Sequence, residues 1–473
     1  MKKIVFVLFS IVILSSCNED FLQTTVEDKI ESENFFKTQE DAVASVNATY
    51  GNLRAWRLAA FGPLILSIAG DDAEKGSSAG DAAFFNDINN FAYTPSAFII
   101  NDYWSGQFFG INLCNQSITN IPNIVMDETL KTRLIAESRF LRAHHYFNLV
   151  RTFGGVPIFN GLPADKNYNI PRNSKEEVYA FILADLDFAA QNLPMNYGGS
   201  DIGRATKGAA KGYIAKVNMY LGNWAQVLSA TNEVIGMGYN LLPNYNSVFR
   251  IANENSVESI FETQATFISG NCDASSSQYS QVQGVRGQYG WGFNVPTQSL
   301  SDSYESGDLR RDATIIYRGE TTPEGDFIAV IGDNPMYNQK SYVPSGQIGN
   351  CAEGSEQNVR IMRFSDILLM NAEAANELND IPQALLSVNK VRVRAGLTPL
   401  GSLLQTQLRD AIWNERRAEF AMESERFLDV VRQGRGATVF GPLGFTAGKN
   451  EVFPIPSESI SLSNGVLAQN PNY

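Results

Sequence analysis

Helical periodicity in two stretches is the feature that most constrains the fold of this chain. Between Ala136 and Val150 apolar residues return every three or four positions, which places them on one face of a helix that ends at Gly154. A second helix begins at Ser174, where Glu177 completes the spacing of a capping box. Two helix–turn–helix pairs follow the same pattern, at 206–235 and at 367–391. The body of the chain is therefore predicted to consist of paired helices.

The helix pairs resemble tetratricopeptide units, in which small residues let neighbouring helices pack closely. The sequence between the two pairs is rich in Gly, Ser, Asn, Gln and Tyr, a composition typical of loops with occasional strands. We expect a mostly α-helical fold with a scaffold at 112–238 and 360–435. Irregular lobes at 51–105 and 239–360 would carry a few short strands and the binding surface, because loops on a rigid scaffold carry function.

The first residues predict a targeting signal. Lys2 and Lys3 precede an apolar run at 4–14, which is too short to cross a bilayer as a helix. The run ends in the sequence LSSC at 14–17, which resembles a bacterial lipobox. We expect 1–16 to be a lipoprotein signal peptide, Cys17 to be lipidated, and 17–473 to form a single domain. An ordinary secretory signal with an incidental cysteine is the alternative.

Composition argues against several classes of function. The chain has 37 Lys and Arg against 50 Asp and Glu, and the formal net charge of −13 repels nucleic acid. Its two histidines, His144 and His145, point about 100° apart on a helix and cannot hold one ion together. We expect them to pack in the core or a groove. No nucleotide, zinc-protease or calcium-loop motif is present, so neither a metal nor a cofactor is expected.

Charged residues at 415–432 could be mistaken for an active site. Glu415, Glu419 and Glu423 recur every four residues, and glycoside hydrolysis needs a pair of carboxylates. However, Glu423 and Arg426 are spaced for a local ion pair, as are Asp429 and Arg432. The prediction is a structural ion-pair network. Cys114, Cys272 and Cys351 are expected to be free, buried thiols.

A sugar needs flat apolar faces for its C–H groups and polar side chains at the rim for its hydroxyls. The aromatic or polar groups that fall in the predicted lobes are Trp56, Arg57, Asp71, Asp72, Phe84, Phe85, Asn86, Tyr289 and Trp291. Each of them could instead serve in packing, and the two aspartates could hold calcium or remain solvated. Trp104 continues at helical spacing into Phe108 and Ile111 and is assigned to the core.

Several ordered blocks together resemble the SusD/RagB family of outer-membrane nutrient-binding lipoproteins of Bacteroidetes. The blocks are ESRFLRA at 137–143, FGGVP at 153–157, GWGF at 290–293, DLRR at 308–311, RFSDILLMNAEA at 363–374, ERRAEF at 415–420 and FPIP at 453–456. The acidic pair Glu19 and Asp20 after Cys17 resembles the surface-export signal of such lipoproteins.

The resemblance implies a lipid-anchored protein on the outer membrane, facing the cell exterior, without catalytic activity. It would capture an oligosaccharide and deliver it to a partner TonB-dependent transporter of the SusC type. A peptide ligand is one alternative. A surface-anchored glycan hydrolase that uses Asp71 or Asp72 is another.

Overall fold

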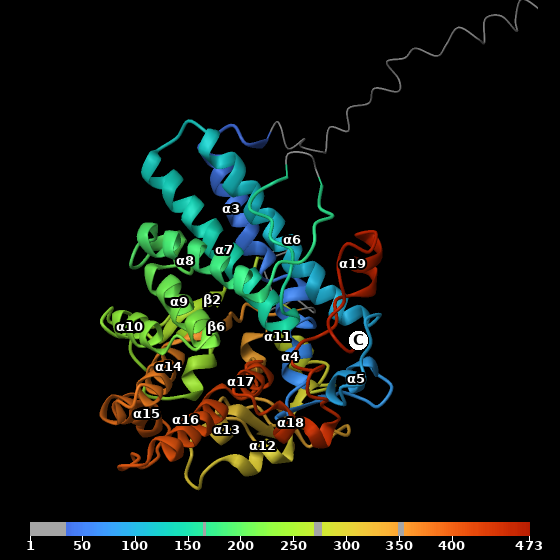
Figure 1. The fold of residues 1–473 in the computed structure, drawn as a ribbon. Coiled ribbons are helices and arrows are strands. Elements are labelled where there is room, and N and C mark those ends of the chain that lie inside the picture. Colours follow the sequence, from blue (N-terminus) through green and yellow to red (C-terminus); the bar gives the residue numbers. More distant parts are fainter. Residues whose placement is uncertain (1–34, 164–166, 269–276, 349–353) are drawn as a thin grey trace, which may run out of the picture.

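The computed structural model describes residues 35–163, 167–268, 277–348 and 354–473. Its scaffold is a stack of helices in which each packs on the next (Figure 1). The first part of the stack consists of α3 (Gln39–Asn52), α6 (Phe98–Asn120), α7 (Glu128–Phe153), α8 (Lys175–Asn192), α9 (Lys207–Leu221) and α10 (Trp224–Ile235). The second part consists of α14 (Phe364–Glu377), α15 (Ile381–Arg394) and α16 (Gln405–Phe420).

Helix α10 packs directly on α14, although more than a hundred residues separate them in sequence. The stack is therefore continuous in space, and 236–363 leave it and return. The scaffold also extends further toward the N-terminus than residue 112, because α6 begins at Phe98 and α3 packs on both α6 and α7.

The predicted helix signals are present. The Ser174 hydroxyl accepts a hydrogen bond from the Glu177 amide, and the Glu177 carboxylate accepts one from the Ser174 amide, which completes the capping box of α8. Gly222 adopts a left-handed conformation (φ 71°) between α9 and α10. The apolar stripe of α7, from Ala136 to Val150, is buried. The prediction of a mostly helical fold is confirmed.

Three two-stranded antiparallel sheets organise the loop-rich parts. β1 (Ala73–Gly76) pairs with β3 (Phe293–Pro296), β2 (Ser259–Thr263) with β6 (Val359–Arg363), and β4 (Ile315–Tyr317) with β5 (Met336–Asn338). The pairing of β1 with β3 places the lobe at 51–105 beside the loop at 289–293.

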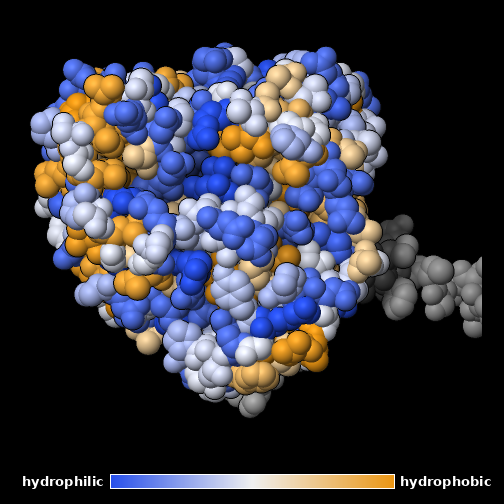
Figure 2. Space-filling view, turned by 90° about the horizontal axis from the view of Figure 1, so that it is seen from below, coloured by the Kyte–Doolittle hydropathy of each residue, from blue (hydrophilic) through white to orange (hydrophobic). Residues whose placement is uncertain are grey.

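Besides short 3-10 helices, the described chain has a π-helix and further short α-helices. They are the π-helix η3 (Trp56–Ala60), α4 (Leu64–Ile68), α5 (Phe84–Asn89), α11 (Tyr279–Gln283), α12 (Gln298–Ser303), α13 (Arg310–Thr314), α17 (Arg426–Arg432), α18 (Gly436–Phe440) and α19 (Ser457–Leu462). On the lower face of the molecule hydrophobic residues lie in separate patches between hydrophilic ones (Figure 2).

The charged residues of α16 form the predicted ion-pair network, but with partners from other elements. The carboxylate of Glu419, which is fully buried, accepts hydrogen bonds from Arg363 at 2.8 Å and Arg394 at 2.6 Å. Glu415 binds Arg310 at 2.7 Å and Arg392 at 2.8 Å. These contacts fasten the inserted lobe to the helix stack.

One local pair was predicted wrongly. Helix α16 ends at Phe420. Met422 (φ 66°) and Ser424 (φ 63°) adopt left-handed conformations, which break the helical path before α17. Because of this break Glu423 does not continue the face of Glu415 and Glu419. It binds Lys340 at 2.7 Å and Arg363 at 2.8 Å instead of Arg426. The predicted pair of Asp429 with Arg432 is present at 3.0 Å.

His144 and His145 are buried, as expected. Nδ1 of His144 lies 2.7 Å from the Tyr213 hydroxyl, and Nδ1 of His145 lies 2.8 Å from Oε1 of Gln107. Burial lowers the pKa of His145 to about 3. Cys114 is a buried free thiol, whereas Cys17, Cys272 and Cys351 lie outside the described residues. None of the described helices is both long and apolar enough to cross a membrane.

Candidate functional site

A group of aromatic rings gathers where η3, α5, the start of α6 and the loop at 289–293 meet. Trp56 stacks on Phe61 with 4.6 Å between ring centroids, and its centroid lies 5.9 Å from that of Trp291. Phe84 lies 4.5 Å from Phe98 in an edge-to-face arrangement. We call this group the aromatic cluster; its members are Trp56, Phe61, Phe84, Phe85, Phe98, Trp291 and Phe293.

The aromatic cluster has two layers. Phe61, Phe85 and Phe293 are buried and form the supporting layer. Trp56, Phe84 and Trp291 are half-buried above it, and the Phe98 side chain is 54% exposed. Aromatic faces held in place by a buried layer lose little side-chain entropy when a ligand stacks on them. The upper layer is therefore a ready surface for a flat, partly apolar ligand.

The structure thus places the candidate residues Trp56, Phe84 and Trp291 in one aromatic cluster around Phe61, but it buries the candidate residue Phe85. The Phe85 ring has no exposed area and packs 5.1 Å from Phe61. A ligand cannot reach it, so its role is support.

Polar groups lie around the upper layer. The Arg57 side chain is 51% exposed and pairs with Asp102 at 3.4 Å, and the Asn86 side chain is exposed at the first turn of α5. Arg286 holds the loop of Trp291, because its guanidinium donates to the Trp291 carbonyl at 3.1 Å and to the Asp81 carboxylate at 2.9 Å.

Trp291 also forms one wall of a neighbouring groove. This groove has a volume of about 470 Å³ and is lined by Tyr289, Trp291, Tyr342 and glycines of the same loop. The Tyr289 ring lies 5.8 Å from that of Tyr342 and accepts a hydrogen bond on its hydroxyl from Gln288 at 3.0 Å. Tyr289 is therefore separate from the aromatic cluster but connected to it through Trp291.

Asp71 and Asp72 are engaged in ion pairs. Arg426 donates two hydrogen bonds to the Asp71 carboxylate, at 2.7 and 2.9 Å. Arg417 donates two to Oδ1 of Asp72, at 2.8 and 2.6 Å. Burial raises the pKa of the Asp71 carboxyl, but hydrogen bonds and charge from Arg426 outweigh burial and bring the pKa below its ordinary value. Both side chains tie the lobe at 51–105 to α16 and α17.

Asp71 and Asp72 are therefore the ion-pair partners of Arg426 and Arg417. The two carboxyls differ, because burial raises the pKa of Asp72, whose Oδ2 is buried and accepts no hydrogen bond within the described residues. Among the residues that the structure describes, no group of three or more His, Cys, Asp or Glu side chains is arranged to hold a metal ion.

Sequence reasoning missed three members of the cluster as site residues, Phe61, Phe98 and Phe293. Phe98 begins α6 with its ring largely exposed, although the sequence shows only an aromatic residue at the start of an apolar stretch. Its contact with Phe84 depends on how α5 packs against α6, which no local pattern contains.

Comparisons with known proteins agree with this architecture. A family model described as "SusD family" matches residues 257–444, and one described as "Starch-binding associating with outer membrane" matches 20–221. "SusD-like protein P2" of Formosa agariphila is 30% identical, and the alignment covers 93% of this chain and 94% of that protein. A "SusD-like protein" of Bacteroides ovatus is 27% identical, with 91% of this chain and 82% of that protein covered.

Solved structures show the same fold. A "Laminarin binding SusD-like protein" superposes with a TM-score of 0.81 at 29% identity, covering 92% of this chain and all of that one. Surface glycan-binding protein A from Bacteroides fluxus superposes with a TM-score of 0.79 at 26% identity, again over 92% of this chain and all of that one. The chain therefore belongs to the SusD family.

Proposed function

We propose that this protein is a cell-surface lipoprotein that binds a nutrient glycan without altering it. The observation that carries the proposal is the two-layered aromatic cluster. A sugar ring has an apolar C–H face and a hydroxyl rim, so it fits aromatic faces bordered by polar groups. Trp56, Phe84 and Trp291 supply the faces, and Arg57 and Asn86 stand at the rim. Tyr289 extends the surface into the adjoining groove.

A β-glucan of the laminarin type is the first ligand to test, because a structural relative at 29% identity is described as binding laminarin. The proposal excludes hydrolysis of the glycan, since Asp71 and Asp72 are held by arginines. A peptide is the alternative ligand, but the aromatic cluster offers mainly ring faces, which favours a sugar.

The proposed role includes delivery. We propose that Cys17 carries the lipid that anchors the protein to the outer membrane, and that the body faces the cell exterior. There it would pass the glycan to a partner TonB-dependent transporter of the SusC type. Support comes from the lipobox and from membership of the family, one of whose models is described as associating with the outer membrane.

Glycan binding is tested by affinity electrophoresis and calorimetry of the purified protein with laminarin, starch and other neutral polysaccharides. Trp291→Ala and Trp56→Ala should each weaken binding by about tenfold or more, as truncation of a central aromatic contact does. Trp224→Ala is the matched control, because Trp224 is half-buried at the start of α10, a different part of the scaffold. Unchanged affinity in both cluster variants would overturn the assigned site.

Anchoring and delivery need separate experiments. Cys17→Ala should release the protein from the membrane fraction, and protease added to intact cells should degrade the wild type. A tagged wild-type protein should co-purify with a TonB-dependent barrel from native membranes. Full protection from protease, or a Cys17→Ala variant that stays in the membrane, would contradict the proposed location.

A further inference from the structure

The outward face of α6 has an unusual composition for a surface helix. Its sequence, FIINDYWSGQFFGINLCNQSITN, contains no Lys, Arg, Glu or His and a single Asp. Apart from Asp102, the side chains on its outer side are amides, a hydroxyl and aromatic rings. Surface helices normally place charged residues on the solvent side, so this face calls for a specific explanation.

Helix geometry places two exposed phenylalanines on this face. Phe98 and Phe109 are eleven residues apart, which returns them to the same side of the helix about 16 Å apart along its axis. Their side chains are 54% and 55% exposed. Asp102 and Ser105 lie between them on the same side, and Asn112 follows one turn later.

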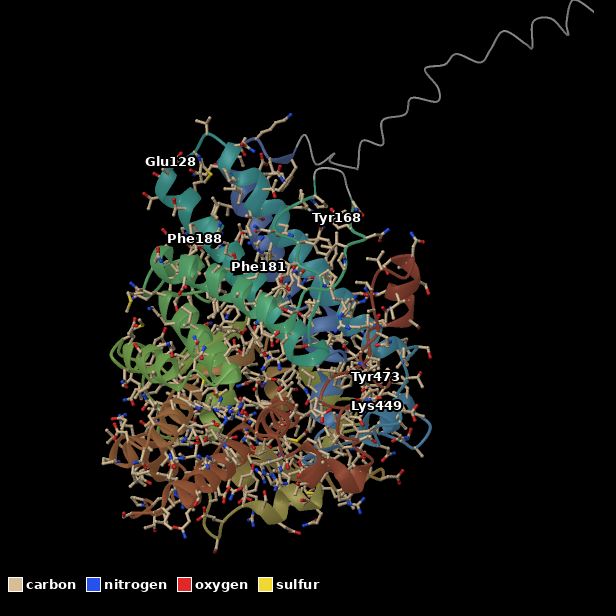
Figure 3. The ribbon with its side chains drawn as sticks, in the orientation of Figure 1. Glu128, Tyr168, Phe181, Phe188, Lys449 and Tyr473 are labelled. Carbon is tan, nitrogen blue, oxygen red and sulfur yellow. The ribbon has the colours of Figure 1, made fainter. Side chains whose placement is uncertain are left out.

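The face is continuous with the proposed glycan site at one end. Phe98 is the last ring of the aromatic cluster, in contact with Phe84 at 4.5 Å. At the other end Phe109 borders a groove of about 490 Å³ between α6 and the residues Pro157, Phe159 and Tyr168. Aromatic rings line this groove in series: Phe108 lies 6.1 Å from Phe159, which lies 5.5 Å from Tyr168. Figure 3 shows Tyr168 on the segment beside α6.

Hydrogen-bonding capacity is available beside these rings. Asn112 lines the groove, and within the described part of the chain its side-chain amide forms no hydrogen bond. Its neighbour Asn115, in contrast, is committed to structure, because it accepts from Arg142 at 2.7 Å and donates to the Phe159 carbonyl at 3.0 Å. An unpaired amide next to exposed rings is the combination that binds sugar hydroxyls and C–H faces.

We propose that the outward face of α6, from Phe98 to Phe109 and Asn112, is a second carbohydrate-binding station. One part of a long, neutral glycan stacks on Trp56, Phe84 and Trp291, and the sugar units that follow lie on this face of α6. This inference rests on the proposed function and deepens it. The ligand is a polymer or long oligosaccharide, and the sugar units that contact α6 are uncharged. The near absence of ionised groups disfavours an anionic lipid surface, which attracts Lys and Arg.

The test compares ligands of increasing length. Calorimetry with laminaritriose, laminarihexaose and laminarin should show that the affinity of the wild type rises with length. Phe109→Ala should weaken binding of the long ligands by about three- to tenfold and leave the affinity for laminaritriose unchanged. Phe109→Trp should retain the length dependence. Leu386→Ala on α15 is the control, because the exposed fraction of Leu386, 56%, matches that of Phe109.

The outcomes separate the two proposals. If Phe109→Ala binds every length as the wild type does, while Trp291→Ala loses binding, the second station is wrong and the proposed function stands. Equal weakening for the triose and the polymer would place Phe109 within the first site and would also overturn the second station. A wild type that binds none of these glucans, nor any neutral polysaccharide, would overturn the proposed function itself.

Discussion

Two regions of this molecule use opposite chemistry. Around α16 a dense group of buried ions joins the inserted lobe to the helix stack, with Glu419 in contact with Arg363, Arg394 and Arg310. The aromatic cluster and the outward face of α6 present mainly rings and amides to solvent, and their ionised groups, such as Arg57 and Asp102, lie at the rim. Charges thus hold the scaffold and lobe together, and neutral groups are left for the ligand surface.

The difference follows from what each region must do. A buried ion pair adds little net stability, because desolvation offsets much of the attraction, but it penalises any other arrangement of its partners. It therefore fixes how the lobe sits on the stack. A neutral sugar gains little from ionised groups and more from stacking on rings that are already in place.

Removing one side of the buried ionic group should have the largest effect. Glu419→Leu leaves three arginines without a shared carboxylate, and we expect the free energy of unfolding to fall by about 3–5 kcal/mol. Urea or thermal denaturation measures this. Glu128→Gln, which removes an exposed pair with Lys131, should change stability little. Equal losses of stability in the two variants would contradict the structural role assigned to the buried ionic group.

Two adjacent residues sharpen the contrast within the aromatic cluster. Phe85→Ala should cost about 3 kcal/mol of stability because it opens a cavity in the supporting layer. Phe84→Ala should instead weaken glycan binding with a smaller loss of stability, since its ring is half-buried. Melting curves and binding isotherms of both variants check this. The reverse assignment, with Phe85→Ala selectively affecting binding, would contradict the two-layer description.

Acid sensitivity should come first from the imidazoles rather than from the ionic group. Burial lowers the pKa of His145 to about 3, whereas an unfolded imidazole titrates near 6.5, so the unfolded state binds the extra proton between these values. Stability should therefore fall as pH decreases from about 6.5 toward 3, by up to about 1.4 kcal/mol per pH unit for one such group. His145→Asn should flatten this slope in melting curves. An unchanged slope would assign the effect to other groups.

The smallest change concerns the aspartates once considered for catalysis. Asp71→Asn weakens one contact with Arg426 and should lower stability modestly, without changing glycan affinity. No glycan turnover is expected in the wild type or in the variant, as measured by release of reducing ends. Turnover that the substitution abolishes would instead support a hydrolase.

Sequence patterns predicted the helices of the scaffold and several residues of the aromatic cluster. Periodicity predicted the hairpins at 206–235 and 367–391, because a buried helix face requires an apolar residue at every third or fourth position. Loop aromatics indicated Trp56 and Trp291, whose rings are neighbours, and Phe84, which joins them through Phe61. Adjacent positions also indicate that the Phe84 and Phe85 rings point in different directions, but which of the two is buried was not visible, since both are the same residue type.

By itself the sequence determined the class of fold, the family blocks and the identity of the charged residues, because these depend on local spacing and composition. Only the tertiary structure decided which charges meet. Glu423 does not pair with Arg426, because left-handed residues interrupt the helix after Phe420. Asp71 pairs with Arg426, which lies far along the chain on α17. Long-range pairing depends on how separate elements pack, and no local pattern records that packing.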